Sequence, residues 1–359
     1  MLCFADGSVY TGLGLGIEGE ATGALCHFHG PIDPQFLLTD PAVKDLMILT
    51  TEPVIGGWGI RRGIDQSDDL WASGLICREI VDFPTHEGHF KNFHRMLESH
   101  GGIALTYLDP DPLVVPAGKE PRVTVLSGAE TRLTETARRL MVEELGREPA
   151  AATWDDSASV KRSTDMECAS PAGKILIIDL GIRKGMLRFL RDRYSVMMVN
   201  PSESNTIPSM NTYDGIVISG GPGQIPSDDL ITHLSRITDA EHPPIYAYGI
   251  GSLAMGMASG LQIIKMDRSH RGMSVPVRIE DDIKPTYQTH SRTFADPSGD
   301  WTVTGRCTVD NMIESLRKTD RSVFLSMYDP APDLRSLDPS DPLSIFMEST
   351  GKMAGGRRT

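Results

Sequence analysis

Hydrophobic and polar positions follow two different patterns along the chain, and the change comes near residue 174. The first part carries short apolar runs typical of strands, at Leu46–Thr51, Gly74–Cys77 and Ile103–Leu108, between long polar stretches. From Lys174 onward, continuous apolar runs alternate with amphipathic segments. The first pattern predicts a mixed α+β domain. The second predicts an α/β domain, with strands buried on both faces of a doubly wound parallel sheet.

The N-terminal domain is expected to open with a hairpin and to contain two helices. Asp6 and Gly7 lie between two apolar runs, which is a strong hairpin signal. A helix is predicted over Phe90–Leu97, where three apolar residues share one face. A second helix is predicted over Ala129–Leu145, capped by Ser127.

These patterns divide the chain into four parts. Residues 1–147 form the predicted first domain, and 148–173 form a polar linker that Trp154 anchors to one domain. Residues 174–335 form the second domain. Residues 336–359, basic and glycine-rich at their end, are predicted to be a tail.

In the second domain, strands and helices are expected to alternate. The predicted strands are Lys174–Asp179, Ser195–Val199, Gly215–Ser219, Ile245–Tyr248 and Trp301–Thr308. The predicted helices are Met186–Arg193 and Asp229–Asp239. This spacing favours parallel strands joined by helical crossovers.

A sharp turn at Gly249 has the shape of a nucleophile elbow. The apolar run Ile245–Tyr248 leads into it, and a helix of small residues follows from Ser252 to about Ala258. Strand, tight turn and helix is the arrangement that presents a reactive side chain above a helix N-terminus. Because glycine has no side chain, the sequence predicts the elbow without its nucleophile.

Composition narrows the class of protein. A length of 359 residues suggests two domains, and 40% hydrophobic with 23% charged residues is usual for a globular protein. No apolar run approaches the roughly 18 residues of a membrane span, and no signal peptide is visible, so we expect a cytoplasmic protein without membrane contact. The net charge of -13 argues against nucleic-acid binding.

The five cysteines are scattered and form no C-x-x-C pair. This predicts reduced thiols rather than a zinc site or a disulfide framework. Cys26 and Cys77 lie in apolar contexts and are expected to be small core residues. We expect neither a cofactor nor a resident metal.

The loop Ser219–Pro226 directly follows a predicted strand and exposes backbone N–H groups at the edge where open α/β sheets bind ligands. A glycine-rich loop of this kind followed by an elbow resembles the class I glutamine amidotransferase domain of carbamoyl-phosphate synthetase small subunits. The first domain agrees. Leu38–Pro41, Thr51–Gly59 and Gly74–Glu79 are similar to that family's LTDP, T-x-P-x-I-G-N-Y-G and G-L-V-V-R-E segments.

The resemblance implies a subunit that hydrolyses glutamine and passes ammonia to a large synthetase subunit, within a hetero-oligomer. The family needs a cysteine at the elbow, a histidine that takes its proton and a glutamate that orients the histidine. Backbone N–H groups of Gly221, Gly223 and Ile250 would then stabilise the oxyanion. His290, in the segment Gln288–Ser291, would lie near the glutamine site.

The chain departs from the family at each catalytic side chain. The nucleophile position is Gly249, the base position is Asp329 and the orienting position is Ala331. Other departures are Ala42, Ser252, Leu253 and the stretch Asp109–Val114. Removing a nucleophile or base lowers the rate by a factor on the order of 10⁴–10⁶. The sequence therefore predicts that the glutaminase is inactive.

Several residues could compensate for the missing cysteine. Ser252 is interpreted as a helix cap or packing residue, and Cys307 as a strand residue away from the elbow. His270 and His290 are interpreted as polar pocket residues or, the commoner case, as surface histidines.

Three hypotheses follow from these residues. The first is an inactive small subunit that partners an ammonia-using large subunit. The second is an independent module that binds a small molecule at the elbow. The third is a working amidase with relocated residues.

Overall fold

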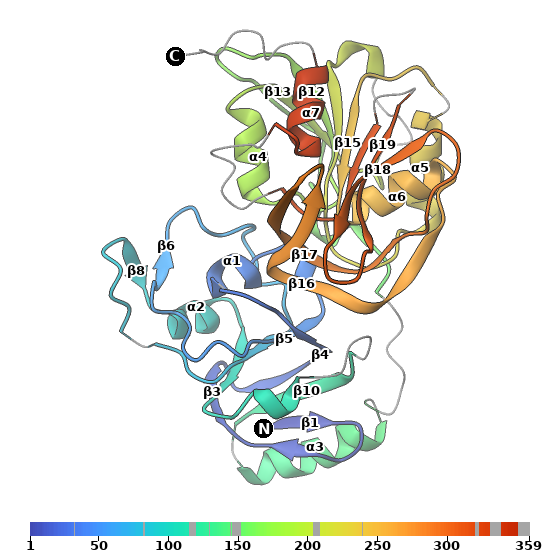
Figure 1. The fold of residues 1–359 in the computed structure, drawn as a ribbon. Helices are drawn as coiled ribbons and strands as arrows, with labels where there is room; N and C mark the ends of the chain where they lie inside the picture. The colour runs from blue at the N-terminus through green and yellow to red at the C-terminus, as the bar shows by residue number, and fades with distance from the viewer. Residues whose placement is uncertain are drawn as a thin grey trace. The chain divides into compact units, whose positions relative to one another are not determined.

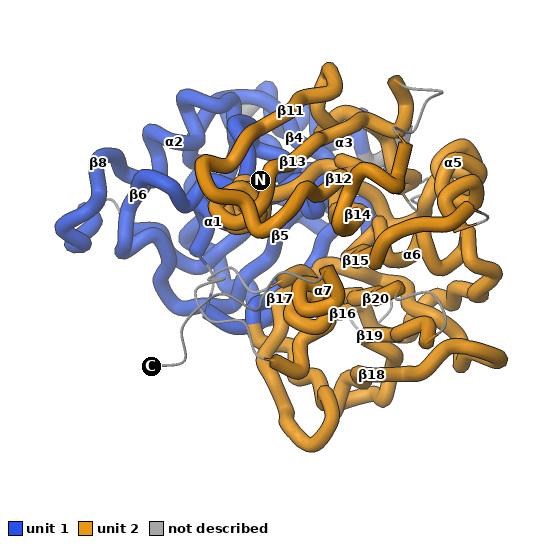
Figure 2. The backbone as a smooth tube through the Cα atoms, turned by 90° about the horizontal axis from the view of Figure 1, so that it is seen from above, with its two compact units in different colours: residues 1–151, 271–273 blue, residues 152–270, 274–359 orange. Residues whose placement is uncertain are grey.

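The computed structural model describes all residues except 32, 82, 115–119, 129, 144, 146–151, 204–208, 239, 320–322, 331–338 and 351–359, and the side chains of 130, 131 and 141–143. The chain forms two compact units (Figure 2). Unit 1 comprises residues 1–151 and 271–273, and unit 2 comprises 152–270 and 274–359. In the part of the chain described, no helix is long and apolar enough to cross a membrane.

Unit 1 contains a mixed eight-stranded sheet in the order β2-β1-β10-β4-β5-β7-β9-β3, and a separate pair, β6-β8. The strands are β1 Leu2–Phe4, β2 Val9–Tyr10, β3 Leu13–Gly16, β4 Gly19–His27, β5 Leu46–Leu49, β6 Ile60–Arg61, β7 Gly74–Ile76, β8 His89–Lys91, β9 Ile103–Thr106 and β10 Arg122–Ser127. Strands β4, β5, β7 and β9 are parallel, and the others pair antiparallel. The mixed α+β character predicted for this part is confirmed.

The hairpin, the three short strands and the two helices predicted in unit 1 are present, with shifted helix bounds. The helices are α1 Pro34–Leu38, α2 Phe93–Ser99 and α3 Glu130–Glu143. Phe90 was expected on the buried face of a helix, and this is wrong: it lies in β8 with 60% of its surface exposed. Asn92 caps α2 through the backbone N–H of Arg95, so the helix cannot begin earlier. Ser127 ends β10 rather than capping α3.

Unit 2 is built on a ten-stranded sheet in the order β11-β13-β12-β14-β15-β20-β19-β18-β16-β17. Its strands are β11 Thr164–Met166, β12 Lys174–Ile178, β13 Ser195–Val199, β14 Gly215–Ile218, β15 Ile245–Tyr248, β16 Ile263–Ile279, β17 Asp282–Phe294, β18 Trp301–Cys307, β19 Ile313–Lys318 and β20 Val323–Ser326. Five neighbouring strands of this sheet, β13-β12-β14-β15-β20, are parallel. Their continuous apolar sequences are buried on both faces, as the pattern predicted.

Helices cover both faces of this sheet (Figure 1). They are α4 Lys184–Arg191, α5 Asp228–Thr238, α6 Ile250–Ala258 and α7 Pro342–Ser349. Helices α5 and α6 share one buried cluster with the strands, and α4 and α7 share the other. The predicted doubly wound α/β domain is therefore confirmed.

Two segments expected to lie outside the domains contribute to unit 2. Within the predicted linker, β11 pairs with β13, and Trp154 is buried and donates its indole N–H to Leu180 O at 3.1 Å. The predicted tail contains α7, which Asp341 caps at Leu343 N. The apolar residues of α7 are spaced for one face and are buried, so this segment is part of the core rather than a tail. Residues 351–359 lie outside the described residues.

Candidate functional site

The turn between β15 and α6 has the backbone of a nucleophile elbow. Gly249 lies at its apex with φ 56° and ψ -129°, a conformation that residues with side chains adopt only under strain. Its N–H donates to Ser326 O at 2.9 Å, which ties the apex to the end of β20. A Cβ atom at this position would lie 3.4 Å from Gly220 Cα and 3.8 Å from Asp329 Oδ1. The apex thus has room for a side chain that the sequence does not supply.

The glycine-rich loop after β14 packs closely beneath the β12–α4 turn. A Cβ atom at Gly221 would lie 1.9 Å from Leu180 O, so only glycine fits there. Ser219 Oγ accepts a hydrogen bond from Leu180 N at 2.9 Å and donates to Gly220 O at 2.8 Å. Among described residues, neither Gly221 N nor Ile250 N donates to a protein acceptor. These two amides keep the donor capacity that an oxyanion site requires.

Asp329, at the position expected for the base, is buried beside the elbow. Its Oδ1 lies 3.9 Å from the guanidinium of Arg183, and its backbone N–H donates to Tyr287 O. Arg183 also donates to Pro330 O at 2.9 Å and stacks over the Tyr287 ring. The resemblance requires a histidine here, whose ring nitrogen passes a proton between the thiol and the leaving group. Asp329 supplies instead a carboxylate beside a guanidinium. Ala331 lies outside the described residues.

The apex residue is Gly249, so none of the four candidate substitutes, Ser252, Cys307, His270 and His290, occupies it. Ser252 is fully buried in α6, where its hydroxyl faces Met327 Sδ at 3.8 Å, so the packing interpretation is confirmed. Leu253 belongs to the core cluster beside α5. Ala42 lies in the 3-10 helix Pro41–Val43 of unit 1. Gly223, with φ 93°, lies against Trp154.

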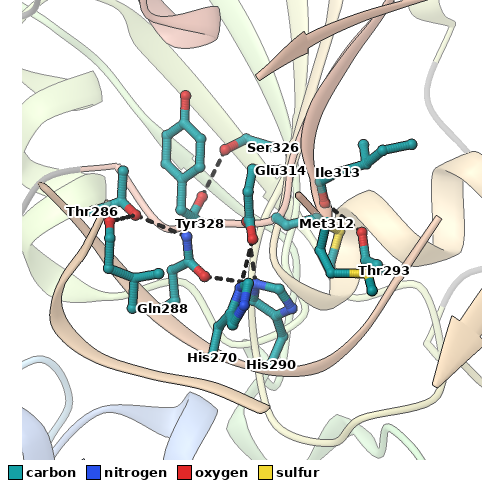
Figure 3. Close-up of polar contacts among 12 residues, drawn as sticks. His270, Thr286, Gln288, His290, Thr293, Met312, Ile313, Glu314, Ser326 and Tyr328 are labelled. Atoms are coloured by element: carbon teal, nitrogen blue, oxygen red, sulfur yellow. Dashed lines mark hydrogen bonds and ion pairs between the residues drawn. The ribbon is translucent and has the colours of Figure 1, made fainter. Parts of the chain in front are cut away.

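His270 and His290 are buried, contrary to the expectation that a surface position is the commoner case. They converge on the fully buried carboxylate of Glu314 (Figure 3). His270 Nδ1 lies 2.6 Å from Glu314 Oε1, and His290 Nε2 lies 3.3 Å from Glu314 Oε2. These side chains come from β16, β17 and β19, and we call them with Gln288 the histidine cluster. The hydrogen bonds of His290 go to this cluster and to Arg292 O.

The charges of the histidine cluster support one another. Burial alone would lower the pKa of His270, but hydrogen bonds from its ring to Cys307 and Glu314, together with the charge of Glu314, raise it to about 11. Asp310, 2.8 Å from Nε2, adds to this rise. Burial would raise the pKa of Glu314, but the charges of His290 and His270 lower it. Without a bound cation, these shifts favour an imidazolium at His270 and a carboxylate at Glu314 near neutral pH.

Little in the sequence indicated the histidine cluster. Glu314 lies among the four buried residues that begin β19, next to Ile313. A carboxylate beside an apolar residue of a strand is the signal that could have indicated a buried polar partner. Cys307, predicted to be a strand residue, ends β18 and is buried beside His270. The ligand atoms of His270, His290 and Glu314 lie within 4.8 Å of one another, as do those of His270, Cys307 and Asp310. Either set has residue types that bind transition metals.

Comparison with known proteins finds two family models. Residues 2–115 match the carbamoyl-phosphate synthase small chain, CPSase domain, and residues 176–327 match the class I glutamine amidotransferase family. The carbamoyl phosphate synthase small chain of Pseudomonas aeruginosa is 26% identical and covers 99% of both chains. That of Neisseria meningitidis is 24% identical over 100% of this chain and 98% of its own. A glutamine amidotransferase structure from Thermotoga maritima has 14% identity and a TM-score of 0.36, covering 45% of this chain and 76% of that one.

Proposed function

The chain belongs to the carbamoyl-phosphate synthase small-chain family, and from this premise we propose that it is a small chain without glutaminase activity. It acts as a structural or regulatory partner of a cytoplasmic large subunit that uses ammonia. The observation that carries the proposal is the apex residue. Gly249 holds the elbow conformation and offers no atom that could attack an amide carbon.

The surroundings of the elbow support the same proposal. Asp329 occupies the base position in contact with Arg183, and its carboxylate would oppose the formation of a neighbouring thiolate. Ser252 is buried in the helix and faces a methionine sulfur. The amides of Gly221 and Ile250 retain donors for a negative charge, but no described side chain at the apex generates that charge.

A role as a partner is supported by exposed aromatic residues in unit 1. Trp58, Phe83 and Phe90 are 58%, 87% and 60% exposed. They lie on segments joined by the β6-β8 pair and by the hydrogen bond from Thr85 N to Gly57 O. Aromatic side chains are enriched at protein interfaces, and several on neighbouring segments mark a binding surface. We assign this surface, Trp58, Phe83 and Phe90, to the large subunit.

Incubating the purified chain with glutamine and measuring glutamate tests the loss of activity. We expect no release above the buffer rate. Release that disappears in Ser252→Ala or His290→Ala would overturn the proposal, because it would identify an amidase with relocated residues. Release unaffected by either substitution would indicate a contaminating enzyme, which a second purification scheme removes.

Association with the large subunit from the same organism tests the partner role. We expect a complex at micromolar concentrations, and Phe83→Ser and Phe90→Ser should each weaken it by about 30-fold if they are central contacts. Ile283→Ser, which replaces a 55% exposed residue in unit 2, is the matched control and should leave the affinity unchanged. Failure of the wild-type chain to bind would contradict the partner role.

One observation favours a second candidate function. Because the amides of Gly221 and Ile250 donate to no other described residue, an anionic small molecule could bind at the elbow with Gly223 nearby. Thermal unfolding with amino acids, nucleotides and inorganic phosphate tests this. A ligand that stabilises the isolated chain without the large subunit would favour an independent binding module.

A further inference from the structure

Each ring nitrogen of His270 and His290 faces an oxygen that accepts hydrogen bonds. His270 Nδ1 faces Glu314 Oε1 at 2.6 Å, and its Nε2 faces Asp310 Oδ2 at 2.8 Å. A neutral imidazole has one N–H, so it can satisfy only one of these two oxygens. His270 therefore needs either a second proton or a cation on one of its nitrogens.

His290 has the same arrangement. Its Nδ1 faces Arg292 O at 2.8 Å, a carbonyl that can only accept. Its Nε2 faces the amide of Gln288, whose orientation follows from its neighbours. Thr286 Oγ1 donates to Val275 O and accepts from Gln288 Nε2, so Gln288 Oε1 points to His290 Nε2 at 3.0 Å. His290 is thus surrounded by oxygen acceptors as well.

We propose that His270 Nδ1, His290 Nε2 and the carboxylate of Glu314 bind one divalent cation of the zinc class, with Gln288 Oε1 as the fourth ligand. The cation takes the place of the two extra protons that the acceptors require. Two neutral imidazoles, the carboxylates of Glu314 and Asp310 and one divalent cation sum to zero charge, which suits a buried site. This inference is independent of the proposed function.

The outer contacts of both histidines match those of metal ligands. Histidines that bind a metal through one nitrogen donate the other N–H to a carboxylate or carbonyl, which fixes the tautomer. Asp310 Oδ2 is the acceptor for Nε2 of His270, and Arg292 O is the acceptor for Nδ1 of His290. Their contacts leave Nδ1 of His270 and Nε2 of His290 directed at Glu314. In addition, Glu314 Oε2 is buried and accepts no hydrogen bond from the described residues, although it lies 3.3 Å from His290 Nε2.

The distances allow a tetrahedral site with small adjustments. Ligand atoms around zinc, at bond lengths of about 2.0–2.1 Å, lie roughly 3.3 Å apart. The separation of His290 Nε2 from Glu314 Oε2 is 3.3 Å and already fits. His290 Nε2 lies 3.0 Å from Gln288 Oε1 and His270 Nδ1 lies 2.6 Å from Glu314 Oε1, so these two pairs must widen. Two imidazoles exclude magnesium and calcium, which prefer oxygen ligands.

The second set, His270, Cys307 and Asp310, is the alternative on the other side of the same ring. In this set His270 Nε2 would bind the cation, and Glu314 would accept the hydrogen bond from His270 Nδ1. We assign the metal to the first set because it contains Glu314 Oε2, which accepts no hydrogen bond from a described residue, and because it uses His290 Nε2, which lies 3.3 Å from that oxygen. A thiolate ligand distinguishes the two sets spectroscopically.

The test uses the full chain, stripped with a chelator and loaded with Zn²⁺ or Co²⁺ alone. We expect one Zn²⁺ to be retained per chain after desalting. We also expect a Co²⁺ spectrum of tetrahedral nitrogen and oxygen ligands, without a sulfur charge-transfer band. His290→Gln and Glu314→Gln should each weaken Zn²⁺ binding at least about 100-fold, beyond the usual effect of an outer partner. Asp310→Asn should weaken binding while keeping the stoichiometry.

Cys307→Ser is the matched control and should bind Zn²⁺ as the wild type does. A sulfur charge-transfer band, or loss of binding in Cys307→Ser, would overturn the assignment in favour of the second set. No stoichiometric retention at micromolar free Zn²⁺, or unchanged binding in His290→Gln, would overturn it outright. If Glu314→Gln does not fold, the wild-type Co²⁺ spectrum and His290→Gln still decide.

Discussion

At the scale of single residues, Gly249 determines what the elbow can do. Its φ of 56° and ψ of -129° lie in a sparsely populated region, where a side chain costs about 1–3 kcal/mol. We therefore expect Gly249→Cys to lower the free energy of unfolding by about 1–3 kcal/mol, measured by urea denaturation. We also expect no glutamate release, since Asp329 stands where a histidine is needed and its charge disfavours the thiolate.

Gly101 provides the control for this substitution. It has φ 69°, and a Cβ there would meet no atom within 4 Å. Gly101→Cys should therefore lose stability through its positive φ alone, without a steric contact. If Gly101→Cys is destabilised and Gly249→Cys is not, then the elbow does not strain a side chain and the argument from its geometry is wrong.

The buried thiols predict a loss of stability at alkaline pH. Burial raises the pKa of Cys26 and Cys77 to about 12, against about 8.5 in an unfolded chain. Above pH 8.5 the unfolded state loses these protons and the folded state keeps them, so stability falls as pH rises toward 12. At pH 10 each thiol should lower the free energy of unfolding by at most about 2 kcal/mol.

Urea denaturation at pH 8 and pH 10 checks this prediction. The difference between the two pH values should shrink in the double variant Cys26→Ala/Cys77→Ala. It should persist in Cys168→Ala, because Cys168 is partly exposed. An unchanged pH dependence in the double variant would mean that other groups cause it.

At the scale of elements, the sequence predicted strands well where both faces are buried and poorly where one is exposed. Strands β12, β14 and β15 are continuous apolar runs, and no other element fits such short segments. Strands β16 and β17 contain prolines and alternate buried with exposed residues, so their length was not foreseen. The histidine cluster was missed for a related reason: its residues become neighbours only when β16 pairs with β17 and, through β18, joins the sheet that contains β19.

Helix α6 must lie close to β17, and its glycines allow this. A Cβ at Gly256 would lie 2.3 Å from the ring of the buried Phe294. We expect Gly256→Ala to destabilise the protein by about 1–3 kcal/mol through overpacking. This is expected although alanine favours a helix by about 1 kcal/mol over glycine.

Thermal unfolding of Gly256→Ala beside Thr232→Ala tests this close packing. Thr232 is exposed on α5, so its substitution should change stability by no more than about 0.5 kcal/mol. Stabilisation of Gly256→Ala would show that helix propensity outweighs the contact with Phe294, and would contradict the packing described.

At the scale of the whole molecule, each unit has its own buried core and its own family model. The order of motifs along the chain was sufficient to predict both, because motif order survives substitutions that remove single side chains. Glutaminase activity cannot be predicted from motif order, because it depends on side-chain atoms at the nucleophile, base and orienting positions. The scaffold and the chemistry can therefore separate, and our proposal is that this protein keeps only the scaffold.

The separation predicts how an assembled enzyme would use its nitrogen donors. A complex of this chain with the large subunit should form carbamoyl phosphate from bicarbonate, ATP and ammonium chloride, and glutamine should not replace ammonia. The physical reason is the lack of a nucleophile at Gly249, since the large subunit can receive only ammonia that is already free. A reaction without the small chain shows how much this chain contributes to the stability of the large subunit and to the rate of carbamoyl phosphate formation. Glutamine-dependent synthesis that persists after repurification of both chains would require an attacking group elsewhere in unit 2, and the assignment of the elbow as inactive would fail.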